Sequence, residues 1–197
     1  MPPKGHAVLS ASSSDRWLHC PPSARLCESY DDKGSDYATE GTDAHALCEY
    51  KLRKALGIEA EDPTKSLTWF SEEMDDCATG YVAYVLEQIE AAKQVCADPV
   101  VLVEQRVDFS RWVEGGFGTA DALIIADGTL KICDYKHGLG VLVRAEENPQ
   151  LMCYALGALE LFDSIYDIET VSMTIYQPRR DNVSTYEISR DALFRWA

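Results

Sequence analysis

The residues best suited to carry chemistry gather at the far end of a predicted hairpin. Two β-prone runs, residues 120–126 and 129–135, are separated by Asp-Gly, a pair typical of a two-residue type I′ turn. The register across such a turn places Asp121 opposite Asp134, with Lys136 at the margin. Directly opposed side chains share one face of a sheet. The sequence therefore predicts two carboxylates and an ammonium group close together.

A divalent cation would resolve the conflict that this register creates. Like charges placed opposite one another destabilise a sheet, and Lys136 compensates only part of the repulsion. Magnesium commonly binds one or two protein carboxylates and keeps water or substrate phosphate as its other ligands. An ordinary salt-bridged pair on an exposed sheet edge is the alternative for Asp121 and Asp134.

Four short motifs follow one another along the chain: Glu-Gly-Thr-Asp-Ala-His at 40–45, Gly-Thr-Ala-Asp at 118–121, Ile-Cys-Asp-Tyr-Lys at 132–136 and Gln-Leu-Met-Cys-Tyr at 150–154. Together they resemble the RecB-type branch of the PD-(D/E)xK nuclease superfamily, and the first resembles the histidine motif of that branch. The overall pattern looks most like a family of uncharacterised RecB-like phage and prophage proteins, which is also similar to CRISPR-associated exonucleases. The resemblance implies a restriction-endonuclease-like core.

The resemblance also implies a role for each matching residue. The implied ligands of a Mg²⁺ or Mn²⁺ ion are His45, Asp121, Asp134 and the backbone carbonyl of Tyr135. With Lys136, which would orient or deprotonate the attacking water, the first three form the implied catalytic set. Gln150 and Tyr154 lie one helical turn apart and would face the active site and the nucleic-acid strand.

Several of these residues have simpler interpretations. Without its motif, His45 is better explained as a helix-surface histidine paired with Glu49 four residues later. Tyr154 could belong to the core. Glu104 ends a predicted strand and could add a carboxylate to the site, although a solvated glutamate is common at a strand end.

The cysteines form neither a disulfide framework nor a zinc motif. There are seven, with wide gaps and no Cys-x-x-Cys pair, so most are expected to be buried, reduced thiols. Many RecB-type proteins hold an iron–sulfur cluster between one N-terminal and three C-terminal cysteines, and Cys20 resembles the first. No cysteine follows Cys153, so a cluster would need a segment beyond Ala197. In this chain a buried thiol is the preferred interpretation of Cys20.

The elements that must position these residues suggest an α/β fold. Residues 17–20 predict a short helix followed by a loop, Thr42 is a candidate cap for a helix ending near Gly57, and residues 72–96 predict a longer helix. Three strands follow, at residues 100–103, 120–126 and 129–135, and then a helix that Asn148 caps and a strand at 170–177. The expected core is a helix, a three-stranded antiparallel meander, a helix and a further strand. It would occupy residues 72–197, after an N-terminal helical extension, residues 1–71, that carries the histidine motif. A helix beginning near Asp191 lacks an end signal, which suggests a fragment of a longer protein.

Composition limits the possible partners. The 197 residues carry a formal net charge of −15, which argues against broad electrostatic adhesion to nucleic acid or anionic lipid. A nucleic-acid site must therefore be local, and the basic residues expected to touch phosphate are Lys136, His137, Arg144, Arg179 and Arg180. No apolar run is long enough for a membrane span or a signal sequence, which predicts a cytoplasmic protein of a bacterial host.

The sequence as a whole predicts a metal-dependent DNA nuclease, more specifically an exonuclease. Its expected setting is recombination, replication or DNA processing of phage or prophage origin, with DNA and phage recombination or replication proteins as partners. The alternative is a catalytically silent module that keeps the fold and binds nucleic acid or protein. The net charge of −15 favours this alternative somewhat.

Overall fold

A five-stranded sheet forms the centre of the protein, seen in a computed structural model that describes residues 7–30 and 34–197. The strands lie side by side in chain order: β1 (Val100–Asp108), β2 (Phe117–Ala126), β3 (Thr129–Tyr135), β4 (Thr170–Gln177) and β5 (Asn182–Ser189). Neighbours are antiparallel except β3 and β4, which are parallel. A parallel pair needs a crossover connection, and α5 (Pro149–Tyr166) supplies it. The predicted α/β class is confirmed.

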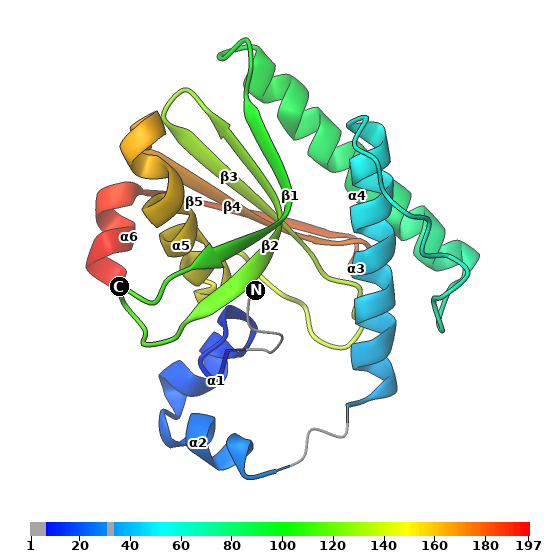
Figure 1. Cartoon of the computed structure of the whole chain (residues 1–197), viewed down its shortest axis with the longest axis horizontal. Coiled ribbons are helices and arrows are strands. Elements are labelled where there is room, and N and C mark those ends of the chain that lie inside the picture. Colours follow the sequence, from blue (N-terminus) through cyan, green and yellow to red (C-terminus); the bar gives the residue numbers. More distant parts are fainter. Residues whose placement is uncertain (1–6, 31–33) are drawn as a thin grey trace.

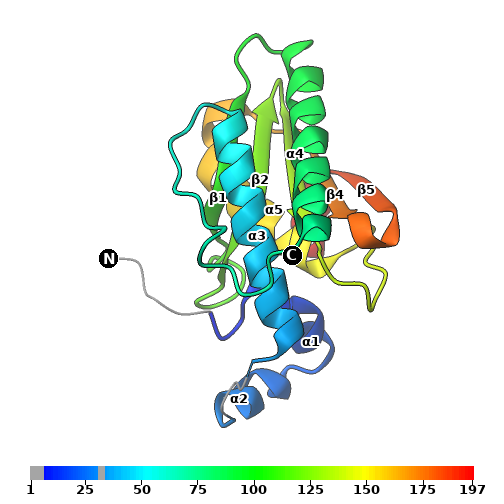
Figure 2. The same cartoon turned by 90° about the vertical axis from the view of Figure 1, so that its right-hand side faces the viewer.

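Three long helices cover the two faces of the sheet (Figure 1 and Figure 2). On one face lie α3 (Asp36–Ala55) and α4 (Glu72–Lys93), and α5 packs on the other. The shorter helices are η1 (Ala11–Ser13), α1 (Ser14–His19), α2 (Pro22–Glu28), η2 (Pro178–Arg180) and α6 (Arg190–Trp196). Among the described helices, none combines the length and the apolar character that crossing a membrane requires.

The predicted hairpin forms with its predicted turn. Asp127 and Gly128 have φ angles of 45° and 72°, the two positive values that a type I′ turn requires, and Ala126 pairs with Thr129. Four apolar side chains near the turn belong to the cluster under α5: Leu123, Ile125, Leu130 and Ile132. The hairpin therefore presents the predicted apolar face to the core.

On both β1 and β2, the side chains stop alternating regularly between the two faces of the sheet, and they do so at facing positions. Val103 and Val107 on β1 are an even number of residues apart and should share a face, as should Ala120 and Ala122 on β2. Instead, Val103 and Ala122 pack toward α3 and α4, whereas Val107 and Ala120 pack toward α5. The change on β1 occurs at Glu104, whose φ of 53° is left-handed. Such a conformation costs a non-glycine residue on the order of 1–3 kcal/mol and is concentrated at functional sites.

Several element boundaries differ from the sequence prediction. Helix α3 begins at Asp36 with Ser35 as its cap, and Thr42 Oγ1 instead donates a hydrogen bond to Ala38 O within the helix. The first turns of α3 are mostly exposed, so they show little apolar periodicity. The short helix α2 occupies part of the predicted loop, and β5 was not predicted at all. Gly57 has the predicted positive φ, 73°, just after α3.

The cysteines are less buried than expected. Cys48, Cys133 and Cys153 are buried, but Cys77 and Cys96 are half-buried, and Cys20 and Cys27 are exposed. The buried-thiol interpretation of Cys20 is therefore wrong, because this residue follows the short helix α1 at the surface rather than packing in the core. All seven are free thiols.

Two helical glycines provide a matched test of packing. An added Cβ at Gly157 would lie 2.9 Å from Val107 Cβ and 3.0 Å from Asp108 N, whereas one at Gly41 would meet nothing within 4 Å. We expect Gly157→Ala to destabilise the protein by about 1–3 kcal/mol through overpacking of α5 on β1. Gly41→Ala should stabilise it by about 0.5–1 kcal/mol through helix propensity. Urea unfolding of both variants measures the difference, and equal midpoints would contradict the close approach of α5 and β1.

Candidate functional site

A cavity of about 720 Å³ opens where β1 and β2 lose their alternation. Its walls come from the N-terminal turn around η1, from α3, from β1 to β3 and from α5. Seven of the residues singled out from the sequence line it: His45, Glu104, Asp121, Asp134, Lys136, Gln150 and Tyr154. Residues from five separate stretches of the chain are thus brought to one place.

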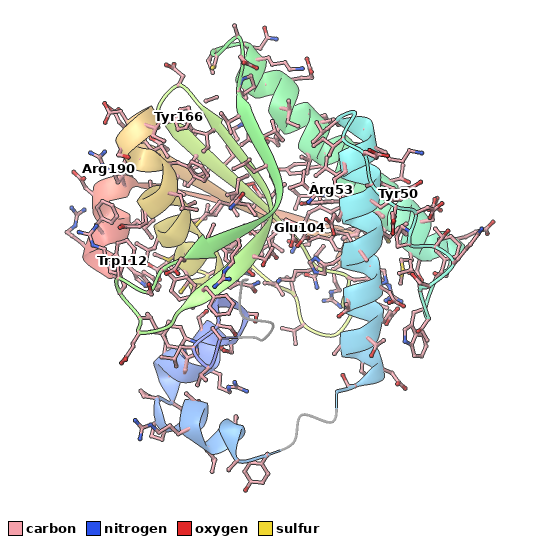
Figure 3. All side chains as sticks on the ribbon, viewed as in Figure 1. Tyr50, Arg53, Glu104, Trp112, Tyr166 and Arg190 are labelled. Atoms are coloured by element: carbon pink, nitrogen blue, oxygen red, sulfur yellow. The ribbon has the colours of Figure 1, made fainter. Side chains whose placement is uncertain are left out.

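One side of the cavity holds an imidazole and two carboxylates. His45 Nδ1, on α3, lies 3.3 Å from Asp121 Oδ1, on β2. Val103 pairs with Ala122, which places Glu104 opposite Asp121, and the possible ligand atoms of Glu104, His45 and Asp121 all lie within 4.8 Å of one another. In Figure 3 Glu104 lies between the sheet and α3. These three side chains could hold a metal ion.

The proposed alternative partner of His45 is engaged elsewhere. Glu49 Oε1 accepts a hydrogen bond of 2.8 Å from Arg53 Nε, one turn further along α3. His45 therefore faces Asp121 in the cavity rather than pairing along its own helix, so the surface-pair interpretation is wrong.

Asp121 also holds the end of β3. Its Oδ2 accepts a hydrogen bond of 2.7 Å from the backbone N–H of Tyr135. The β2–β3 ladder ends at Ala122 and Cys133, so the direct pairing of Asp121 with Asp134 that the register predicts is not formed. The Asp121 carboxylate instead accepts the backbone hydrogen bond of Tyr135 that the backbone of β2 would otherwise accept. The two aspartates remain on adjacent antiparallel strands and line the same cavity.

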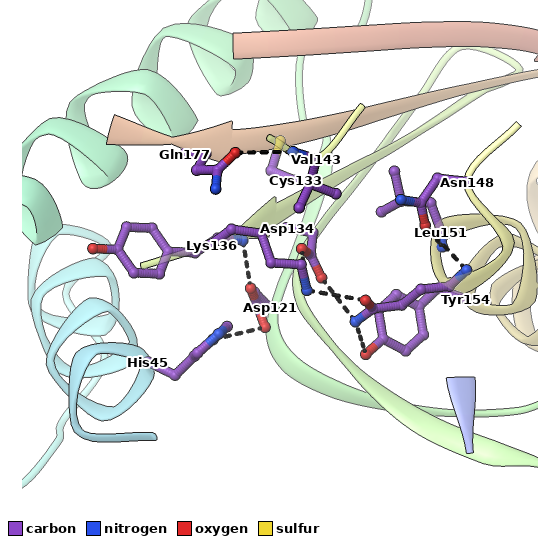
Figure 4. Close-up of polar contacts among 12 residues, drawn as sticks. His45, Asp121, Cys133, Asp134, Lys136, Val143, Asn148, Leu151, Tyr154 and Gln177 are labelled. Carbon is purple, nitrogen blue, oxygen red and sulfur yellow. Dashed lines mark hydrogen bonds and ion pairs between the residues drawn. The ribbon is translucent and has the colours of Figure 1, made fainter. Parts of the chain in front are cut away.

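The other side of the cavity holds Asp134 within a hydrogen-bonded group (Figure 4). Asp134 is 1% exposed, and its Oδ2 lies 2.8 Å from Lys136 Nζ in an ion pair. Gln150 Oε1 accepts from Lys136 Nζ at 3.0 Å, while Gln150 Nε2 donates to Asp134 Oδ1 at 3.3 Å. Gln150 Nε2 also lies 2.9 Å from the Tyr154 hydroxyl oxygen. Helix α5 thus fixes the lysine and the aspartate together.

The start of α5 explains how Gln150 reaches this position. Asn148 is the cap that the sequence predicts, and its side chain accepts hydrogen bonds from the backbone N–H groups of Gln150 and Leu151. Pro149 occupies the first helical position, where a missing N–H costs nothing. Tyr154 is buried in the core cluster under α5 and also lines the cavity.

Burial and charge alter the protonation of the site. Burial lowers the pKa of His45, but Asp121 outweighs it and raises the pKa to about 9. Burial and the neighbouring Asp121 raise the pKa of Glu104 to about 8. Burial also raises the pKa of Asp134, only partly offset by Lys136. For Asp121 the nearby His45 outweighs burial, and its pKa is lowered. The site therefore holds more protons than isolated side chains would near neutral pH.

The metal-free protein should become less stable as the pH rises from about 6.5 to about 9. His45 and Glu104 have folded-state pKa values of about 9 and about 8, above their ordinary values of 6.5 and 4.5. The folded state therefore binds more protons than the unfolded chain across this window, so stability falls as the pH rises. Melting temperatures in EDTA measure the slope, which His45→Asn should flatten. An unchanged slope in that variant would show that His45 does not hold the extra proton.

Most of the other basic residues expected at the site lie outside the cavity lining. His137 is buried near a second cavity of about 530 Å³, and its Nε2 lies 3.4 Å from Glu40 Oε1. Arg179 forms ion pairs of 2.9 Å with Glu40 and 3.0 Å with Glu73. Two further predicted phosphate contacts, Arg144 and Arg180, are exposed but do not line the site cavity. Of the five basic residues, Lys136 alone lines it.

Sequence reasoning missed several cavity residues, and Arg106 and Phe117 are among them. Both lie beyond the predicted strands, since β1 extends to Asp108 and β2 begins at Phe117. The polar residues Glu104, Gln105 and Arg106 interrupt the apolar run that indicated β1. The alternation of apolar and polar residues over Val107, Asp108 and Phe109 was the available signal that the strand continues.

The fold and the cavity define a mixed α/β protein with a candidate metal-binding group. The chain belongs to a family described as protein of unknown function (DUF2800), whose family model matches residues 6–197. Among solved structures it is similar to one titled "Crystal structure of SSO0001", with 16% sequence identity over 73% of this chain and 75% of that chain. The TM-score of that comparison is 0.28, too low to carry a structural argument.

Proposed function

We propose that this protein is a metal-dependent DNA nuclease that hydrolyses phosphodiester bonds with Mg²⁺ or Mn²⁺. The observation that supports the proposal is the convergence of two groups in one cavity. His45, Glu104 and Asp121 form a possible ligand set, and Asp134 with Lys136 forms a buried ion pair. A hydrolytic site of this class needs both a metal-binding group and a positioned proton-transfer or electrostatic group.

The donor set fits a hard divalent cation. Glu104 and Asp121 offer carboxylate oxygens, which Mg²⁺ and Mn²⁺ prefer, and His45 offers one imidazole nitrogen. The raised pKa of Glu104, caused by burial and by Asp121, indicates carboxylate crowding that a cation would relieve. The ion would polarise the scissile phosphate and lower the pKa of a bound water. We propose His45 and Asp121 as metal ligands and Glu104 as a possible third ligand. That Asp134 and the backbone carbonyl of Tyr135 also bind the ion stays a prediction from the sequence.

Lys136 is the proposed catalytic cation. Its ammonium group is held between Asp134 Oδ2 and Gln150 Oε1, at 2.8 and 3.0 Å, yet its side chain retains 23% exposure toward the cavity. From this position the ammonium group can orient an attacking water or stabilise charge on the phosphate. Gln150 and Tyr154 would fix the lysine and contact the strand.

The order of elements agrees with the proposed restriction-endonuclease-like core. Helix α4 is followed by the β1–β2–β3 meander, the α5 crossover and β4. From the resemblance of the four motifs, we propose an exonuclease acting in recombination, replication or DNA processing, with DNA and phage proteins as its partners.

A specific observation favours the alternative of a silent binding module. His137 and Arg179, two predicted phosphate contacts, face Glu40 and Glu73 within the protein instead. With a net charge of −15, few cations are then left to hold DNA. A binding module would keep the cavity without a reaction.

Cleavage of end-labelled single- and double-stranded DNA with Mn²⁺ separates the two functions. The nuclease should release shorter products that EDTA abolishes. A preparation that binds metal but cleaves neither DNA nor RNA would support the binding module. Labels at the 5′ and 3′ ends in separate reactions would also distinguish exonuclease from endonuclease products.

A further inference from the structure

Arg106 and Phe117 form a stacked pair on the wall of the site cavity. Arg106 lies on β1 and Phe117 on the neighbouring strand β2, and the guanidinium carbon is 4.2 Å from the centre of the phenyl ring. Both side chains line the same cavity as Asp121 and Lys136. A guanidinium stacked on a ring has one face covered, and its planar edge of N–H donors stays available to a ligand.

Arg106 forms no ion pair within the described part of the chain, although its charge acts at longer range on Asp108 of the same strand. No described carboxylate lies within 4.0 Å of its guanidinium, and its side chain makes no hydrogen bond to a described residue. Arg53, Arg111, Arg179 and Arg190 are all in ion pairs. The other basic side chains of the cavity, Lys136 and His45, are paired with Asp134 and Asp121. In a chain of net charge −15, an unpaired arginine on the wall of a cavity is the group best placed to receive an anion.

We propose that Arg106, supported by Phe117, anchors a backbone phosphate of a single nucleic-acid strand whose neighbouring phosphodiester lies at Asp121 and Lys136. The proposal rests on the proposed function, because that function places a nucleic acid in this cavity. A planar guanidinium binds phosphate through two parallel N–H donors, which a lysine cannot reproduce. Arginine and aromatic side chains along a groove are also the usual means of holding single strands.

The shape of the site favours one strand over a duplex. The carboxylate of Asp134 is almost fully buried, at the base of a cavity that α3 and α5 flank. The N-terminal turn forms a further wall, held in place because Ser10 O accepts a hydrogen bond of 3.0 Å from Trp17 Nε1 and because Ala11 is fully buried. A single strand can bend its phosphates into such a recess, whereas a duplex keeps its backbone on a stiff, convex surface.

Binding measurements without cleavage test the proposal. The full chain is titrated in EDTA into a short, labelled oligothymidylate at salt concentrations between about 50 and 200 mM. Arg106→Ala should weaken binding about tenfold and make the slope of log K against log salt shallower by about 0.7, the value for one phosphate contact on a single strand. Arg106→Lys should keep the slope but bind several-fold more weakly. Phe117→Leu should also weaken binding with little change in slope, because the charge remains.

A matched control and a duplex complete the test. Arg195→Ala, on α6 away from the cavity lining, should bind like the wild type. A blunt duplex of the same length should bind at least about tenfold more weakly than the single strand. Melting temperatures confirm that each variant is folded, and Arg106→Lys provides the test if Arg106→Ala is not.

The outcomes separate this proposal from the nuclease proposal. Wild-type affinity and slope in both Arg106 variants would overturn the phosphate anchor even if the protein cleaves DNA. No binding of the oligothymidylate by the wild type, or duplex binding as tight as single-strand binding, would also overturn it. A loss of affinity in Arg106→Ala, in a protein that cleaves nothing, would keep the anchor and remove the nuclease.

Discussion

Lys136→Ala is expected to lower metal-dependent DNA cleavage by roughly 10²-fold or more, while affinity for DNA and metal changes only a few-fold. The ammonium group lies 2.8 Å from Asp134 and 3.0 Å from Gln150 at the wall of the cavity. In the nuclease, this group acts on the attacking water and on the charge that develops at phosphorus. Its contribution is therefore made chiefly in the transition state, and its loss lowers the rate more than the binding. Single-turnover cleavage and oligonucleotide titration measure the two effects separately.

Two lysine variants are the controls for Lys136→Ala. Lys131 lies on β3, which ends just before Lys136, but its Nζ donates to Gln88 on α4, so Lys131→Ala should cleave like the wild type. Lys136→Arg keeps a positive charge beside the buried Asp134, and it should still lose most of the activity because the guanidinium places its donors differently. If Lys136→Ala cleaves at the wild-type rate, Lys136 is not catalytic. If its affinity alone falls, the binding module is the better account.

Mn²⁺ should raise the melting temperature of the wild type by roughly 5–10 °C. A ligand at about 100 times its Kd stabilises the folded state by about 2.7 kcal/mol, and each kcal/mol shifts the melting temperature of a chain of this size by about 2–4 °C. The expected ligands are His45 and Asp121, whose facing atoms lie 3.3 Å apart. Because metal binding must displace the protons that His45 and Glu104 hold, the shift should grow between about pH 7 and 9.

Asp121→Asn should abolish this thermal shift. The amide can still accept the hydrogen bond from the backbone N–H of Tyr135, so the substitution removes the charge with little change in shape. Glu160→Gln is the control, because Glu160 is an exposed carboxylate on α5 that pairs with Arg111 outside the cavity. An equal shift in Asp121→Asn and the wild type would place the ion elsewhere.

Local sequence signals predicted the parts of the fold that depend on neighbouring residues. Asp127-Gly128 defines its own turn through two positive φ angles, and Asn148-Pro149 defines the start of α5. Helix α4 has a long apolar stripe, and its range, Glu72–Lys93, is close to the predicted 72–96. The edge strand β5 was missed because half of its side chains are exposed and its residues alternate without a strong apolar run.

The geometry of the site depends on contacts that no local pattern encodes. The hairpin register brings Asp121 near Asp134, but the left-handed Glu104 and the bond from Tyr135 N to Asp121 alter the end of the ladder. The pairing of His45 with Asp121 joins α3 to β2, 76 positions apart in sequence, so it follows only from the packing of that helix on the sheet. The family resemblance, rather than residue spacing, selected His45.

The sequence also did not reveal which basic side chains are free to contact phosphate. His137 and Arg179 were expected to contact phosphate because they are basic and were expected near the site, yet both face Glu40. Arg106 was not selected, although it lines the cavity without a carboxylate partner among the described residues. Which cations are free in an acidic protein depends on long-range pairing, and long-range pairing is visible only in the folded chain.

The most direct measurement of the central claim is a Mn²⁺ titration that follows metal binding and phosphodiester hydrolysis in the same samples. Electron paramagnetic resonance reports free Mn²⁺, and a labelled single-stranded DNA reports the initial rate. The account predicts that hydrolysis rises with occupancy of a site that Asp121→Asn removes, and that EDTA reverses both. Saturation of the metal site without hydrolysis, or hydrolysis that Asp121→Asn retains in full, would contradict it.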